Sequence, residues 1–103
     1  ASGGGLTQCM EIAGMAAAFN TPSANGGAWT HHNMHLHAGV ANGGMVEYHY
    51  PAVKVCEQVF GPLPVPENDW LTLPEAPGLG FEPDTDRVRE LAAMPTSHGK
   101  GKA

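Results

Sequence analysis

Histidine is unevenly distributed along this chain of 103 residues. Five of the six histidines lie in the stretch THHNMHLHAGVANGGMVEYHY, residues 30 to 50, which also holds a single acidic residue, Glu47. Imidazole nitrogens bind transition metals and exchange protons near neutral pH. A carboxyl group at a strand end can instead donate or accept a proton at a substrate. The stretch therefore fits either a histidine metal site or a helix and a strand that deliver one glutamate.

The spacing of the histidines supports a zinc site only in part. His31 and His35 lie one helical turn apart, so both side chains could reach one metal ion. The pattern H-E-x-x-H lacks its glutamate here, and His37 falls on a different helix face from His35. Packing and surface roles are common for half-buried histidines. A non-catalytic module that binds a transition metal through His31, His32, His35 and His37 remains an alternative hypothesis.

Composition excludes several classes of protein. The net charge is −5, and the only basic cluster is the terminal HGKGKA, so the sequence does not predict nucleic-acid binding. It shows no apolar run long enough to span a membrane and no signal-peptide pattern at its start, so we expect a soluble, cytoplasmic protein. Cys9 and Cys56 lack metal or redox spacing and are expected to be free thiols in the core.

The pattern of apolar residues and turn signals predicts alternating helices and strands. Helices are expected at residues 8–19, with Thr7 as a cap and Asn20 as a stop, and at 31–41, capped by Thr30 and ended by NGG. Short strands are expected at residues 22–25 and in MVEYHY, the latter ended by Pro51. This order is typical of parallel α/β units.

The chain changes character after Pro51. GPLPVPEND is expected to be a proline-rich linker, WLTLP a short edge strand, and DTDRVRELAAM a final helix with acidic residues at its N-terminus. Earlier in the chain, Asn25, Gly26 and Gly27 either shape a substrate pocket or form a tight turn that favours glycine.

The order of these motifs resembles the C-terminal end of the enolase superfamily, in its mandelate racemase and acid-sugar dehydratase branch. The resemblance is carried by HLHAGVANGGMVEYH, by WLTLPEAPGLGFEPD with its specific PGLGFEPD loop, and by GGGLTQCMEIAGMAAAFN, which is similar to the sixth barrel loop and helix. These motifs extend over nearly the whole chain.

The resemblance implies an α/β fold, namely the C-terminal part of a (β/α)8 barrel. Residues 1–60 would be barrel, with the seventh strand at 22–25 and the eighth at 45–48 beside helices six and seven. Residues 61–103 would be the linker, edge strand and closing helix, packing towards an N-terminal capping domain that this sequence does not contain. Mg²⁺ is the implied cofactor, with its ligands on the third, fourth and fifth strands, outside this chain.

The resemblance also implies a catalytic role for Glu47. Its position matches an acid at the end of the eighth strand that hydrogen-bonds a substrate carboxylate as it becomes an enediolate, for which the carboxyl group must hold a proton. His49 lies two positions further on, so on a strand it would share the face of Glu47, where it could tune the glutamate or touch the substrate; a hydrogen bond that anchors a loop is an equal alternative. The family's histidine base would fall at about Gly27, and no histidine is there. His31, His32 or a group elsewhere on the barrel must then serve as the base.

The expected parent protein is a Mg²⁺-dependent enzyme that removes the proton α to a carboxylate, with dehydration of an acid sugar as the expected reaction. Racemisation, epimerisation or cycloisomerisation by the same first step are alternatives. Its expected partners are the remainder of the barrel, the capping domain and a small carboxylate substrate. We expect the full-length protein to form a homo-oligomer, and this chain alone to be inactive.

Overall fold

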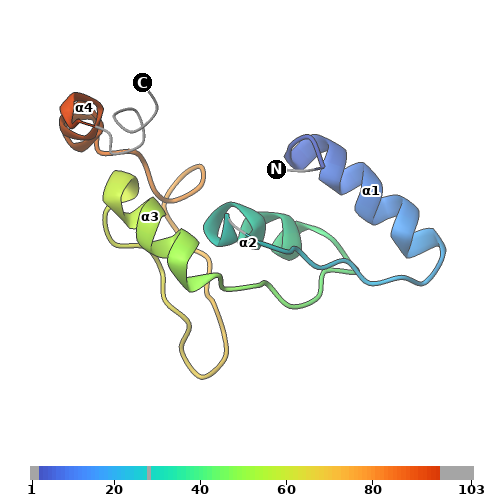
Figure 1. Ribbon diagram of the computed structural model, residues 1–103. Coiled ribbons are helices and arrows are strands. Elements are labelled where there is room, and N and C mark those ends of the chain that lie inside the picture. The colour runs from blue at the N-terminus through green and yellow to red at the C-terminus, as the bar shows by residue number, and fades with distance from the viewer. Residues whose placement is uncertain (1–2, 28, 96–103) are drawn as a thin grey trace.

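Four α-helices joined by long connections make up the described part of the chain in this computed structural model (Figure 1). The structure describes residues 3–27 and 29–95. The helices are α1 (Leu6–Ala18), α2 (Thr30–Gly39), α3 (Tyr50–Phe60) and α4 (Thr85–Ala93). Within these described residues the extended segments form only two isolated bridges, Ser23 with Gly43 in parallel and Glu67 with Trp70 in antiparallel orientation.

The two predicted N-terminal helices are confirmed, but their predicted caps are wrong. Helix α1 begins after Gly5 rather than at Thr7, and Asn20 has a left-handed φ of 56°, as expected of a helix stop. Helix α2 begins after Trp29, whose backbone is left-handed (φ 70°, ψ 37°), and Thr30 makes no capping bond. The Thr30 hydroxyl has a different partner, described below.

Neither predicted strand, at residues 22–25 or at 45–48, forms; one isolated parallel bridge joins Ser23 to Gly43, two residues before the second predicted strand. Ser23 N donates to Asn42 O at 2.8 Å, and Gly44 N donates to Ser23 O at 2.7 Å. A single strand pair is marginal outside a larger sheet, and the described residues supply no third strand to flank it. The predicted order is nonetheless kept, because α2 connects two extended segments that pair in parallel.

Helix α3 was not predicted, because Pro51 was interpreted as the end of a strand. Proline is well suited to the first turn of a helix, where its missing N–H has no acceptor to lose. The His49 side chain also caps this helix, its Nδ1 accepting from Ala52 N at 3.3 Å. Gly61, with φ 73°, follows the last turn. The chain therefore turns into a helix directly after the Glu47 segment.

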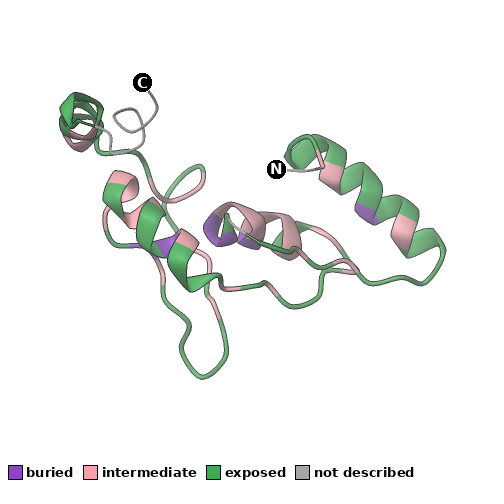
Figure 2. Cartoon of the chain, viewed as in Figure 1, coloured by how far each residue is buried: buried purple, intermediate pink, exposed green. Residues whose placement is uncertain are grey.

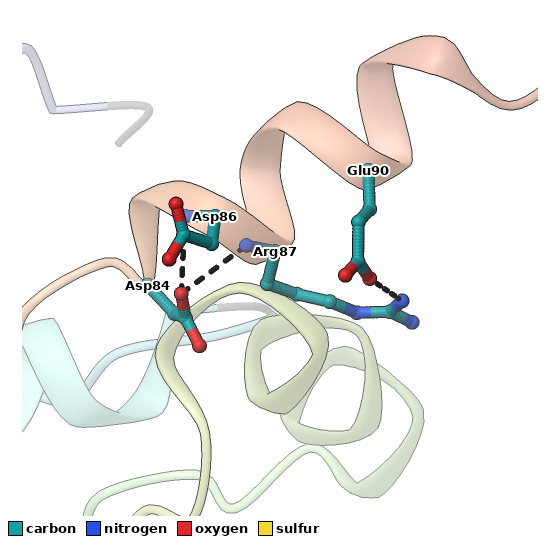
Figure 3. A network of polar contacts seen from close by, with 4 residues as sticks. All are labelled: Asp84, Asp86, Arg87 and Glu90. Carbon is teal, nitrogen blue, oxygen red and sulfur yellow. Dashed lines mark hydrogen bonds and ion pairs between the residues drawn. The ribbon is translucent and has the colours of Figure 1, made fainter.

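The C-terminal prediction is correct for the helix and wrong for the strand. WLTLP forms no strand, and its Trp70 is bridged to Glu67 across a turn. Helix α4 begins after Asp84, whose carboxylate accepts from Asp86 N and Arg87 N at 3.1 Å each (Figure 3). Figure 3 also shows the exposed ion pair between Arg87 and Glu90 at 3.0 Å, a kind of contact that contributes little to stability.

Few apolar side chains are buried in this arrangement. Figure 2 shows that buried positions are few along the ribbon. Among the described residues, the buried apolar ones are Ala13, Met34, Val53 and Leu63. The accessible surface is 7575 Å², against about 5,500 Å² expected for a folded chain of this mass. Helix α1 contacts α2, and α3 contacts α4. None of the described helices is long and apolar enough to cross a membrane. Cys9 and Cys56 are unpaired thiols, as predicted, but both are only half-buried and do not lie in the core.

Candidate functional site around Glu47

Glu47 is held at three of its own atoms by residues that precede it in the chain. Its backbone N–H donates to Asn25 Oδ1 at 3.1 Å, and its backbone carbonyl accepts from Thr30 Oγ1 at 2.8 Å. Its carboxylate Oε2 accepts from the N–H of Gly27. The side chain stays exposed. A carboxylate anchored in this way has a defined direction yet remains open to a ligand.

The parallel bridge explains why these residues meet. Ser23 pairs with Gly43, and Gly27 and Glu47 each lie four residues further along the two paired segments. Residues at equal offsets in a parallel pair stay side by side at the same edge. Gly27 also has φ 82°, a left-handed angle that favours glycine, and nothing lies within 4 Å of where its Cβ would be. The ends of the two extended segments therefore form one small site.

Asn25 links the Glu47 backbone to α2. Its Oδ1 must face the Glu47 N–H, since an amide NH₂ cannot accept a hydrogen bond, and this fixes the orientation of the carboxamide. His37 Nε2 lies 3.1 Å from the same oxygen and must therefore donate to it. Burial lowers the pKa of His37, which favours the neutral ring with its proton on Nε2. Asn25 therefore orients the Glu47 backbone, and its contribution to a substrate pocket stays a prediction.

The histidines of α2 are spread over separate partners. His31, only 3% exposed, places Nε2 2.7 Å from Pro64 O, and His35 places Nε2 2.8 Å from Leu79 O. Both rings thus tie α2 to the segment that follows α3. In the described part of the chain, no group of three or more histidine, cysteine or acidic side chains is placed to hold a metal ion. These contacts do not assemble the four-histidine site of the alternative hypothesis.

His32 packs in an aromatic cluster. Its ring centroid lies 5.5 Å from that of Trp29, 5.9 Å from Phe60 and 5.2 Å from Phe81, all in edge-on geometry. Burial, and the neighbouring His31 and His35, lower the pKa of His32. Aromatic pairs of this geometry add to the stability gained from burial. The cluster joins α2, α3 and the PGLGFEPD loop, and places His32 in a packing role.

Two further predicted site residues lie beside the glutamate without reaching towards it. His49 is exposed, and because no strand forms here, its side chain caps α3 instead of sharing a face with Glu47. Gly26 is exposed in the turn before Gly27, with nothing within 4 Å of a Cβ position. A cavity of about 360 Å³ lies elsewhere, in the loop from Leu63 to Thr72, and none of the candidate site residues lines it.

Thr30 and Asn42 are the residues that the sequence did not single out for the site. Asn42 Nδ2 lies 3.0 Å from Ala13 O, 2.9 Å from Thr21 O and 3.2 Å from Ser23 Oγ, so it anchors the bridge to α1. Asn42 belongs to an NGG stretch whose residues are typical of a helix end, and Thr30 stands at a typical cap position. Local sequence therefore carried no signal for either long-range contact.

The family model for the enolase C-terminal domain-like family matches residues 1–87. The chain belongs to this family, in the mandelate racemase and enolase superfamily. The resemblance found in the sequence is thereby confirmed, and the domain is of the α/β class, in a superfamily of enzymes that generally use Mg²⁺. No curated protein and no solved structure matched.

Proposed function

We propose that this chain carries one catalytic acid, Glu47, of an enolase-superfamily enzyme that removes the proton α to a carboxylate and then expels a β-hydroxyl from an acid sugar. The observation that supports this most is the register of the two paired segments. It brings the Glu47 carboxylate against Gly27, so that two successive segment ends meet at one edge, where enzymes of barrel architecture place their chemistry.

The contacts of Glu47 suggest how its carboxyl group would act. Oε2 accepts the Gly27 N–H, which leaves Oε1 as the oxygen that we assign to carry the proton. That proton would be donated to the substrate carboxylate as negative charge builds on it. A donor aimed at developing oxyanion charge contributes roughly 3 kcal/mol to the transition state. Glu47 would thus stabilise charge and would not remove the α-proton.

We assign the general base and the Mg²⁺ site to parts of the parent enzyme outside this chain. His31 is bonded to the Pro64 carbonyl and His32 is packed among aromatic rings, so neither suits proton removal beside Glu47. The described residues also do not fit a magnesium site, because they contain no group of three or more histidine, cysteine or acidic side chains placed to hold a metal ion. Mg²⁺ would spread the charge of the enediolate from its site on earlier barrel strands.

The proposal extends to the architecture of the parent enzyme. Residues 1–60 would complete a (β/α)8 barrel, with α1 and α2 as its sixth and seventh helices. Residues 61–103, of which 96–103 lie outside the described residues, would return towards a capping domain. The exposed side chains of Leu6 and Met10, one turn apart on α1, are consistent with a face that another part of the barrel covers. The full-length enzyme would form a homo-oligomer.

The proposed reaction can be tested on the full-length parent protein with a panel of acid sugars in D₂O. Loss of the α-proton and of a β-hydroxyl releases water and leaves an enol that becomes a 2-keto acid. A dehydratase should therefore produce keto acid, detected as its semicarbazone, and should lose this activity when EDTA removes Mg²⁺. Deuterium at the α-carbon without keto acid would indicate a racemase or epimerase. Neither product from any carboxylate would contradict proton abstraction altogether.

A further inference from the structure

Thr30 has the most completely buried side chain among the described residues. It is 1% exposed, although it stands at the first position of α2, where a threonine usually lies at the surface. A buried hydroxyl needs hydrogen-bond partners, because an unpaired one costs about 1–3 kcal/mol. The partners of Thr30 are therefore informative about why a polar residue is buried at this point.

Both partners of the hydroxyl belong to the backbone around Glu47. Thr30 Oγ1 donates to Glu47 O at 2.8 Å and lies 3.4 Å from His49 N, from which it accepts. A hydroxyl can do both at once, having one proton to give and two lone pairs. The two bonds fall on consecutive peptide groups, on either side of Tyr48. The stretch that follows Glu47 is thereby fixed to the start of α2.

We propose that Thr30 is a positioning residue for Glu47, holding the backbone from which the glutamate side chain projects. Asn25 holds the N–H of Glu47 and Thr30 holds its carbonyl, so the residue is fixed from both ends before its carboxylate meets Gly27. This inference rests on the proposed catalytic role of Glu47.

A helix-capping role does not account for the burial of Thr30. The residue that caps α2 is Trp29, whose carbonyl accepts from His32 N and Asn33 N at 3.1 and 2.9 Å, and no side chain makes a capping bond there. The left-handed backbone of Trp29 is unfavourable for a residue with a side chain by about 1–3 kcal/mol. It turns the chain immediately before Thr30, which places the hydroxyl towards the Glu47 segment.

The test compares Thr30→Val and Thr30→Ser in the full-length parent enzyme, with kcat and KM measured on its own substrate. Valine keeps the shape and removes the hydroxyl, whereas serine keeps the hydroxyl. A shift of about 1 Å at a reacting group can cost on the order of 100-fold in rate. We expect Thr30→Val to lower kcat by about 10- to 100-fold with little change in KM, and Thr30→Ser to retain most of the rate. Thr72→Val, at an exposed threonine in the connection between α3 and α4, is the matched control and should leave kcat unchanged.

A double-mutant cycle with Glu47→Gln separates positioning from general stabilisation. If Thr30 acts through Glu47, Thr30→Val should cost much less in the Glu47→Gln background than in the parent. Equal losses in both backgrounds, or a parental kcat in Thr30→Val, would overturn the role of Thr30 while leaving the role of Glu47 intact. A parental kcat in Glu47→Gln alone would overturn the proposed function, and the positioning role with it.

A second pair of variants covers the case in which Thr30→Val does not fold. Thr30→Ala and Thr30→Ser both lack the methyl group and differ only in the hydroxyl. The serine variant should then be faster than the alanine variant by about 10-fold or more, for the same geometric reason. Equal kcat values in this pair would contradict the inference.

Discussion

Helix α1 and the segment from Asn25 to Glu47 differ in what their side chains contact. The N–H, the carbonyl and the carboxylate of Glu47 find partners within the chain, through Asn25, Thr30 and Gly27, although Asn25 Nδ2 and His37 Nδ1 are buried without a hydrogen-bond partner. Helix α1 instead leaves apolar side chains in solvent, with Met10 51% and Met15 68% exposed and only Ala13 buried. The geometry of the site is therefore set by local polar contacts, whereas the stability of α1 depends on apolar surface that this chain does not cover.

The largest expected effect is a difference in thermal unfolding between the chain alone and the parent enzyme. Because so little apolar surface is buried and the bridged segments have unpaired edges, residues 1–103 alone should show no cooperative thermal transition and should tend to aggregate. The parent should melt cooperatively under the same conditions, followed by circular dichroism. A sharp melt of the isolated monomer well above room temperature would count against the barrel assignment.

Substitution of one exposed methionine on α1 tests whether its side chain is covered in the parent enzyme. Met10→Ser in the parent enzyme should lower the free energy of unfolding by about 2 kcal/mol or more, if another part of the barrel covers this face. Glu11→Ser, at the neighbouring exposed position, is the control and should change it by less than about 0.5 kcal/mol. Denaturant titration measures both. Equal, small effects would mean that the Met10 face is solvated in the parent too.

Asn42 connects the two regions, and its loss should have a smaller effect. Asn42→Ala removes the amide that reaches the Ala13 and Thr21 carbonyls, which should cost about 1–3 kcal/mol of stability. Gln58→Ala, on the exposed face of α3, should be close to neutral. Chemical denaturation of the parent enzyme is again the measurement. A neutral Asn42→Ala would show that the bridge holds without this anchor.

The sequence predicted three of the four described helices and the family, but not the long-range contacts around Glu47. Helices α1, α2 and α4 followed from apolar periodicity and from end signals such as Asn20 and the acidic start of α4, and the family followed from the PGLGFEPD loop. Helix α3 was missed because Pro51 ends a strand and begins a helix equally well. The buried hydroxyl of Thr30 and the Asn25 contact depend on residues far apart in sequence, which local propensity does not encode.

The smallest expected effect concerns pH. Burial lowers the pKa of His32 and of His37 below the ordinary value of 6.5, so the unfolded chain binds these protons more readily than the folded one. Their contribution to stability is complete above pH 6.5 and is lost as the pH falls from there through the lowered folded-state pKa values. His32→Phe, which preserves ring packing, should flatten this dependence in thermal melts of the parent enzyme between about pH 7.5 and pH 5. An unchanged slope would contradict the burial of this ring.

The most direct test of the central claim is the steady-state kinetics of Glu47→Gln in the full-length enzyme. The amide keeps the size of the side chain and can still accept the Gly27 N–H, so the fold should survive. Because the proposed interaction forms mainly in the transition state, kcat should fall by about 100-fold or more while KM changes little. His49→Ala should reduce kcat less, and His35→Ala should reduce stability instead of turnover, since its ring bonds the Leu79 carbonyl. A Glu47→Gln enzyme with the parental kcat and KM on its native substrate would contradict the catalytic role of this glutamate.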